Sequence, residues 1–187
     1  METIAIKPAK NDSRKKGQVN LEKHNSDIVK GLRNLFLNEL KEIYWSEAAI
    51  KKPLHKMIKH TRSDELMDEL NKHLEAIKQH QIRLEEVFLI IDDKIAIVKS
   101  KAIEGLIKDV ENAMDETKKG ILKDACIISA ALKIKHYGIA SYGILCFYAR
   151  TLGEDHAATL LHETLVEEKE ANEKLSQIIE SIKLEMV

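Results

Sequence analysis

Four polar residues stand at positions where an amphipathic helix would present an apolar side chain to a core, and two histidines stand at similar positions. These six residues are Glu47, His73, His80, Lys135, Glu168 and Asn172. Carboxylate and imidazole groups are ligands that iron and manganese take inside helical bundles. A lysine carries a positive charge and has no acceptor, so when it is buried it needs a carboxylate partner. The set therefore indicates a polar site in an apolar interior, suited either to metal binding or to ion pairing.

Apolar periodicity predicts the helices that must position these residues. Spacings of three and four residues predict long helices over about 27–60, 64–91, 121–152 and 155–183. Ser63 is suited to a helix N-cap, Gly153 to a helix end, and Pro53 predicts a bend late in the first helix. Residues 92–120 are too many for a tight turn and carry a shorter amphipathic pattern over 103–114. We therefore predict an all-α fold, a ferritin-like four-helix bundle with a long crossover that carries a short extra helix.

The polar residues of each predicted hairpin fall at matching depth. When the first hairpin is reflected about its turn, Glu47 lies between His73 and His80, which are each roughly 5 Å away along the helix axis. Reflection of the second hairpin about its turn sets Glu168 level with Gly138. The sequence thus predicts that the polar residues within each hairpin cluster together.

Composition limits the class of protein that could contain such a site. The chain has 187 residues, of which 33% are charged and 44% hydrophobic, and only two prolines, which fits one mainly helical domain. The 30 basic and 31 acidic residues give no net charge that would favour nucleic acid or an anionic membrane. Because the sequence has neither a long apolar run nor a secretory leader, we expect a cytoplasmic protein without membrane contact.

The N-terminal segment differs from the rest of the chain. Over residues 1–26, lysine and arginine outnumber the acidic residues, and apolar periodicity is weak. This composition predicts a flexible basic tail over 1–26 that precedes a bundle domain over 27–187. A basic arm that binds DNA and a solvated leader would have the same composition. We expect a solvated leader, and therefore no nucleic-acid partner.

Four stretches of the sequence resemble the YciE/YciF family of bacterial stress proteins. These stretches are Leu37–Tyr44 with Glu47, His73–Glu75, Lys135–Gly143, and Leu161–Leu165 with Glu167–Lys169. The likeness extends over residues from about 28 to 182. It implies a ferritin-like, rubrerythrin-related bundle that forms a homodimer and is associated with stress responses, and it implies no particular reaction.

The sequence departs from that family where the resemblance implies metal ligands. The family pattern Glu-His-Tyr-Glu is here Lys135, His136, Tyr137 and Gly138, and an Asp of the family is here Asn172. An ammonium about 4 Å from a divalent ion would be unfavourable by on the order of 8 kcal/mol at an effective dielectric constant near 20. We therefore expect a degenerate di-metal site in which Lys135 is the internal cation that replaces a ligand. The remaining members of this site are Glu47, His73, His80, Glu168 and Asn172.

Three interpretations of this site remain open. Lys135 pairs with Glu47 and Glu168 in place of a metal, or the site retains iron or manganese. In the third, the lysine extends to the bundle edge and the histidines are ordinary core residues.

The first interpretation favours a stress-associated, metal-free dimeric bundle that acts through its surfaces and has no cofactor. The alternative is an iron- or manganese-binding di-metal carboxylate protein that acts on peroxide or oxygen. The sequence indicates no catalytic residue, so whether the protein is an enzyme stays open.

Overall fold

The computed structural model describes the backbone of residues 12–185 and the side chains of residues 25–181. The helices are α1 (Asp12–Ala49), α2 (Lys51–His60), α3 (Asp64–Ile90), α4 (Lys101–Glu116), α5 (Ile121–Thr151) and α6 (Asp155–Glu185). The described part of the chain contains no strand, so the prediction of an all-α fold is confirmed. None of these helices has an apolar stretch long enough to cross a bilayer.

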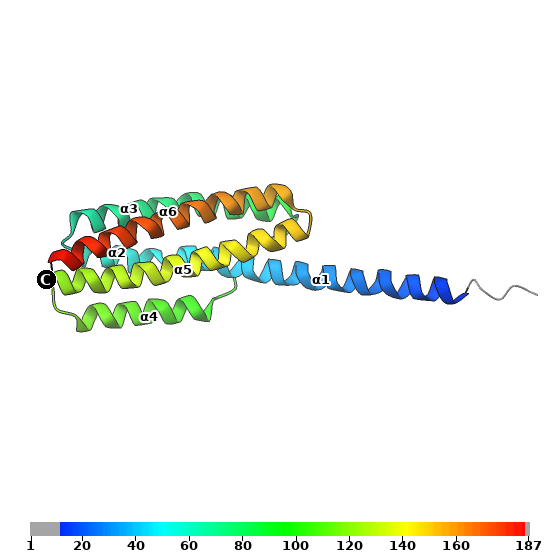
Figure 1. The fold of residues 1–187 in the computed structure, drawn as a ribbon, viewed down its shortest axis with the longest axis horizontal. Coiled ribbons are helices and arrows are strands. Elements are labelled where there is room, and N and C mark those ends of the chain that lie inside the picture. The colour runs from blue at the N-terminus through cyan, green and yellow to red at the C-terminus, as the bar shows by residue number, and fades with distance from the viewer. Residues whose placement is uncertain (1–11, 186–187) are drawn as a thin grey trace, which may run out of the picture.

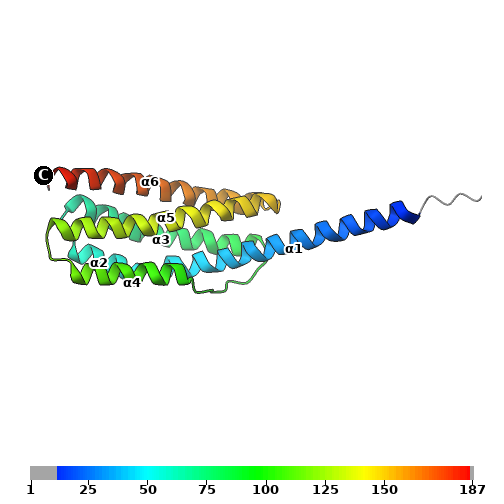
Figure 2. The same cartoon turned by 60° about the horizontal axis from the view of Figure 1, so that its bottom comes forward.

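The long helices pack side by side in a four-helix bundle (Figure 1). Both α1 and α6 pack against α3 and α5, while α2 continues the line of α1 beside α3. The crossover from α3 to α5 carries α4, which lies outside the bundle against α5 and α2 (Figure 2). Both the crossover and its extra helix are thus found where the sequence predicts them.

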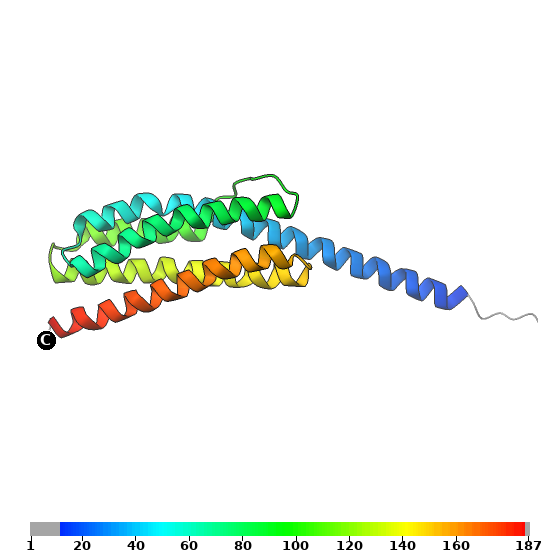
Figure 3. The same cartoon turned by 90° about the horizontal axis from the view of Figure 1, so that it is seen from above.

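The first helix is longer than the sequence predicts. It begins at Asp12, and its N-terminal half projects beyond the bundle (Figure 3). Residues 12–26, which the sequence places in a flexible tail, are therefore helical in the structure. Residues 1–11 of the predicted tail lie outside the described residues, and the flexibility of the segment stays a prediction.

Local sequence signals explain where helices begin and end. The interruption between α1 and α2 falls at Ile50 because Pro53 has no backbone N–H and its ring crowds the carbonyl four residues earlier. At the start of α3, the Ser63 hydroxyl accepts a hydrogen bond from the Leu66 N–H at 3.2 Å. Gly153 follows α5 with φ 78°, a conformation that glycine adopts without strain. The predicted cap and helix end are confirmed, and the helix is interrupted near the predicted bend.

The apolar interior is divided into two clusters along the length of the bundle. One cluster joins α2 and α4 to the N-terminal halves of α3 and α5 and the C-terminal half of α6. The other joins α1 to the C-terminal halves of α3 and α5 and the N-terminal half of α6. Buried polar side chains from all four long helices lie between them. We call this region the polar layer, and it consists of Glu47, His73, His80, Lys135, Tyr142 and Glu168.

Candidate functional site

The structure brings five of the six predicted site residues into the polar layer. Glu47 comes from α1, His73 and His80 from α3, Lys135 from α5 and Glu168 from α6, and each is at most 5% exposed. Asn172 lies one turn beyond Glu168 on α6 and is half-buried. Helical periodicity is what positions them, because each occupies the inward stripe of its own helix.

Lys135 forms a buried ion pair with Glu168. Its Nζ lies 2.6 Å from Glu168 Oε1, and the lysine is only 1% exposed. Burial raises the pKa of Glu168 above its usual value, although the charge of Lys135 opposes this shift. The structure therefore places the ammonium inside the bundle, not at its edge.

Glu47 has different partners from those that the sequence suggests. Its Oε1 accepts hydrogen bonds from the Tyr142 hydroxyl at 2.7 Å and from His80 Nδ1 at 3.1 Å. No ion pair joins Glu47 to Lys135 among the side chains that the structure describes. Burial lowers the pKa of His80, but Glu47 and Glu168 outweigh burial, so the net shift is upward. His80 is therefore protonated more readily than an ordinary imidazole.

His80 also connects the polar layer to the surface. Its Nε2 lies 3.1 Å from Glu167 Oε2, and Arg83 holds the same carboxylate through two hydrogen bonds of 2.7 and 2.6 Å. The hydrogen bonds from Arg83 lower the pKa of Glu167. Sequence reasoning missed these partners and the role of Tyr142, although Arg83 is three residues after His80 and so lies on the same helix face.

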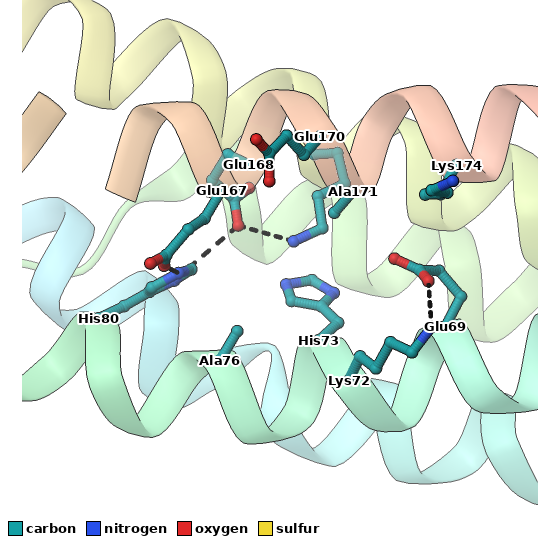
Figure 4. Close-up of a pocket in the computed structure, with 11 residues that line it drawn as sticks. Glu69, Lys72, His73, Ala76, His80, Glu167, Glu168, Glu170, Ala171 and Lys174 are labelled. Carbon is teal, nitrogen blue, oxygen red and sulfur yellow. Dashed lines mark hydrogen bonds and ion pairs between the residues drawn. The ribbon is translucent and has the colours of Figure 1, made fainter. Parts of the chain in front are cut away.

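A cavity of about 280 Å³ opens between α3 and α6 beside this network (Figure 4). Its inner wall includes His73, His80, Lys135 and Glu168, and its rim is made of charged side chains. Burial, helped by the charges of Lys135 and His80, lowers the pKa of His73 well below 6.5, so this ring is neutral. His73 Nδ1 has no hydrogen-bond partner among the described residues, and the same holds for Asn172 Oδ1 and Glu47 Oε2.

Gly138 provides the space that the Glu168 carboxylate occupies. A Cβ atom at this position would lie 2.5 Å from Glu168 Oε2, which is closer than real Cβ contacts allow. This contact confirms that Glu168 and Gly138 lie at the same depth. Glycine at position 138 therefore makes room for the carboxylate that Lys135 holds.

The donors as arranged do not fit a two-metal centre. Glu168 Oε1 is taken by Lys135, and Glu47 Oε1 already accepts two hydrogen bonds. Within residues 25–181, no three carboxylate, histidine or cysteine side chains are grouped so as to hold a metal ion. His136, beside Lys135, is exposed, so it does not supply a ligand inside the bundle. The arrangement is instead a hydrogen-bonded network in which Lys135 and His80 face the carboxyl groups of Glu47 and Glu168.

Comparison with known proteins gives consistent matches. The family described as "Domain of unknown function (DUF892)" matches residues 31–187. Protein YciF of Escherichia coli (strain K12) is 35% identical over 151 residues, which cover 80% of this chain and 91% of that protein.

Two solved structures also match. The crystal structure of the E. coli stress protein YciF has a TM-score of 0.78 at 34% identity, and the match covers 81% of this chain and 96% of that one. YcfI from Rhodopseudomonas palustris has a TM-score of 0.76 at 37% identity, covering 78% and 92% of the two chains. The resemblance that the sequence motifs indicate is thereby confirmed.

Proposed function

The chain belongs to the DUF892 family, and on this premise we propose that it is a stress-associated, metal-free helical bundle that acts as a dimer in the cytoplasm. A relative that matches most of the chain is named as a stress protein, which supports the proposed association with stress. In this proposal the bundle keeps the interior position of a di-metal site but fills it with an ion pair. The protein then works through its surfaces, without a metal reaction.

The observation that carries this proposal is the buried contact of 2.6 Å between Lys135 Nζ and Glu168 Oε1. A cation in that place has the sign of charge that a metal would bring, so it stabilises the remaining carboxylates without one. Leaving Glu168 ionised and unpaired in this interior would be strongly unfavourable. The ammonium also repels an incoming divalent ion.

The dimer is proposed to form through the outer face of the second half of α5. Phe147 is 57% exposed there and Ile144 is 36% exposed, although both are apolar. Ala140 is exposed on the same helix and Gly143 is half-buried, and these small residues allow a neighbouring helix to approach closely. Apolar exposure of this kind favours burial against a second copy.

Elemental analysis tests the metal-free claim. Protein purified from cells grown with abundant iron and manganese is expected to contain neither metal above the background of a non-binding protein. Two metal ions per chain would instead support the alternative, an iron- or manganese-binding protein that acts on peroxide or oxygen.

A triple variant provides the companion test. Lys135→Glu, Gly138→Glu and Asn172→Asp together return carboxylates to the positions where the family resemblance implies them. We expect this variant to take up iron or manganese, because the added carboxylates and the loss of the ammonium both favour a cation. Matched control substitutions at exposed α5 and α6 positions, Lys133→Glu and Glu173→Asp, should leave uptake absent.

A further inference from the structure

We propose that the projecting part of α1 pairs with the same part of a second copy of this chain, as a short parallel coiled coil. The contact is assigned to residues 25–35, which we call the pairing segment. The inference rests on the proposed dimer and adds a second contact to it. Because the family match begins at residue 31, the family relationship does not imply this contact.

The pairing segment has the heptad pattern of a two-stranded coiled coil. Apolar residues that alternate at spacings of four and three form a narrow stripe along a helix, which a second helix of the same kind covers. Ile28, Leu32 and Leu35 have these spacings, and Leu21 continues the pattern in the sequence. The remaining positions outside the stripe and its flanks are polar, and they are Ser26, Asp27, Lys30, Arg33 and Asn34.

The stripe is exposed to solvent although it is apolar. Every residue from 25 to 31 is exposed, and this part of α1 extends beyond the other helices (Figure 3). Ile28 is 56% exposed and Leu35 is 55% exposed, while Leu32 is half-buried. A helix without tertiary packing is only marginally stable in water, since most helix stability in proteins comes from packing an apolar face. Pairing with another helix would supply that packing.

Asn25 indicates that the other helix is identical and parallel. It lies three residues before Ile28, at a position of the stripe where an apolar residue is usual. One asparagine at such a position specifies register and strand number in coiled coils, because its amide has both a donor and an acceptor and so pairs with a second amide. A parallel pair in register sets Asn25 against Asn25 and each apolar residue against its own copy. An antiparallel pair centred on Asn25 would set Ile28 against Glu22.

The residues that flank the stripe also favour pairing of identical segments. In a parallel pair, the flanking positions of the two copies lie close to each other, and like charges there would repel. Within the pairing segment these positions hold Val29 and Gly31, which are uncharged. Val29 is 55% exposed, so the contact would bury it as well. The stripe and its flanks therefore form one uncharged surface, apart from its single amide.

The parallel orientation is continuous with the dimer face proposed on α5. The turn after α5 lies at the end of the bundle from which α1 projects, and Arg33 joins α1 to Glu154 of this turn by an ion pair of 3.2 Å (Figure 1). Phe147 lies in the last turns of α5, close to the same end. A parallel pair keeps both bundles at one end of the coil, where their α5 faces can meet. An antiparallel pair would place the bundles at opposite ends.

The contact on α5 also explains how so short a coil can form. Stable coiled coils sustain the pattern over about three or four heptads, which is more than the pairing segment offers. Once two bundles are joined through α5, pairing of the two α1 helices becomes an intramolecular step with a high effective concentration. The two contacts therefore stabilise each other within one dimer.

Disulfide cross-linking tests the proposal directly. Ile28→Cys in the full-length protein is expected to give a covalent dimer under mild oxidation, because parallel pairing sets residue 28 against its own copy. Lys30→Cys is the matched control, since residue 30 is exposed on the outer side of the same helix turn and should cross-link far less. The parent, which keeps Cys126 and Cys146, gives the background. Equal cross-linking at the two positions, or none at position 28, would overturn the proposal.

An acidic substitution measures the contribution of the stripe to dimer affinity. Ile28→Asp should raise the dissociation constant of the dimer by about tenfold or more, since each copy loses a buried apolar side chain. Lys30→Asp introduces the same group on the outer side and should have a much smaller effect. Circular dichroism verifies that both variants retain their helix content. An Ile28→Asp protein that dimerises as tightly as the parent would contradict the pairing.

Failure of the pairing and failure of the proposed dimer have different signatures. A dimer that Phe147→Asp dissociates, without cross-linking at position 28, would refute the pairing and leave the proposed function intact. A parent protein that is monomeric would refute both.

Discussion

Lys135 places a positive charge in the buried interior, and its neighbours determine whether the fold tolerates that charge. Glu168 pairs with it directly, while His80 and Tyr142 hold the other carboxylate, Glu47. In such an interior, removing one partner of a pair leaves a bare charge, which is worse than removing both. Substitutions of Lys135 and Glu168 should therefore have strongly non-additive effects on the free energy of unfolding.

Replacement of Lys135 alone is expected to destabilise the protein. Lys135→Met leaves Glu168 buried without its cation, so the free energy of unfolding should fall by about 3–5 kcal/mol. The double variant Lys135→Met, Glu168→Leu should recover most of this loss, because no charge is then left unpaired. Urea unfolding of both variants measures the effect. A single variant as stable as the parent would show that the pair does not stabilise the interior.

The two buried histidines should respond to pH in opposite ways. The pKa of His80 is raised above 6.5 in the fold, so its contribution to stability is complete below pH 6.5 and is lost as pH rises through the folded pKa. The pKa of His73 is lowered, so below pH 6.5 the unfolded chain takes up a proton that folded His73 does not. Stability from His73 therefore declines as pH falls.

Imidazole titration by NMR, combined with unfolding at several pH values, checks this prediction. The advantage of the parent over His80→Gln should shrink above pH 6.5. The parent should lose stability relative to His73→Gln below that pH. Two rings that titrate together near 6.5 would contradict the geometry of the polar layer.

At the scale of the helices, α5 and α6 approach each other very closely at one point. Gly138 on α5 faces the Glu168 side chain of α6, whereas Gly105 on α4 is exposed and has no atom within 4 Å of the position that a Cβ would take. The same substitution at the two glycines therefore separates helix propensity from packing.

Alanine at these two glycines should have effects of opposite sign. Gly138→Ala is expected to displace Glu168 and to lower the free energy of unfolding by about 1–3 kcal/mol. Gly105→Ala should raise it by about 0.5–1 kcal/mol, since alanine favours a helix over glycine. Thermal unfolding of the two variants provides the comparison. Equal stabilisation by both would mean that Glu168 does not occupy the space beside Gly138.

The helices could be predicted from the sequence because their signals are local. Apolar spacing, the Ser63 cap, the Gly153 end and the effect of Pro53 each act within a turn or two. The depth of the polar residues followed from helix rise and hairpin symmetry. The direction of each side chain could not be predicted in the same way. Whether Glu47 contacts Lys135 or His80 depends on the rotation of the helices about their axes, and spacing along the sequence does not determine that rotation. The composition of residues 12–26 likewise did not predict that α1 continues through them.

For the whole molecule, the exposed apolar side chains of α5 are the feature that bears on assembly. Phe147 is 57% exposed in the second half of the helix, and Leu122 is 56% exposed at its other end. The proposed dimer buries the first and leaves the second in water. The two positions thus form a matched pair for a test of the interface.

Light scattering on two variants tests this assembly. The parent should have twice the chain mass of 21.3 kDa, and Phe147→Asp should shift the protein toward the monomer, because a charge would be buried at the interface. Leu122→Asp should leave the dimer intact. A monomeric parent, or equal dissociation by both substitutions, would contradict the proposed face.

Crystals grown in the presence of manganese test the central claim most directly. Anomalous scattering at the manganese edge would locate any metal, and the density would show the position of the Lys135 side chain. We predict no anomalous peak between Glu47 and Glu168, with Lys135 Nζ in hydrogen-bond contact with Glu168. A pair of manganese ions in the polar layer, or a lysine ammonium extending into solvent, would contradict the account.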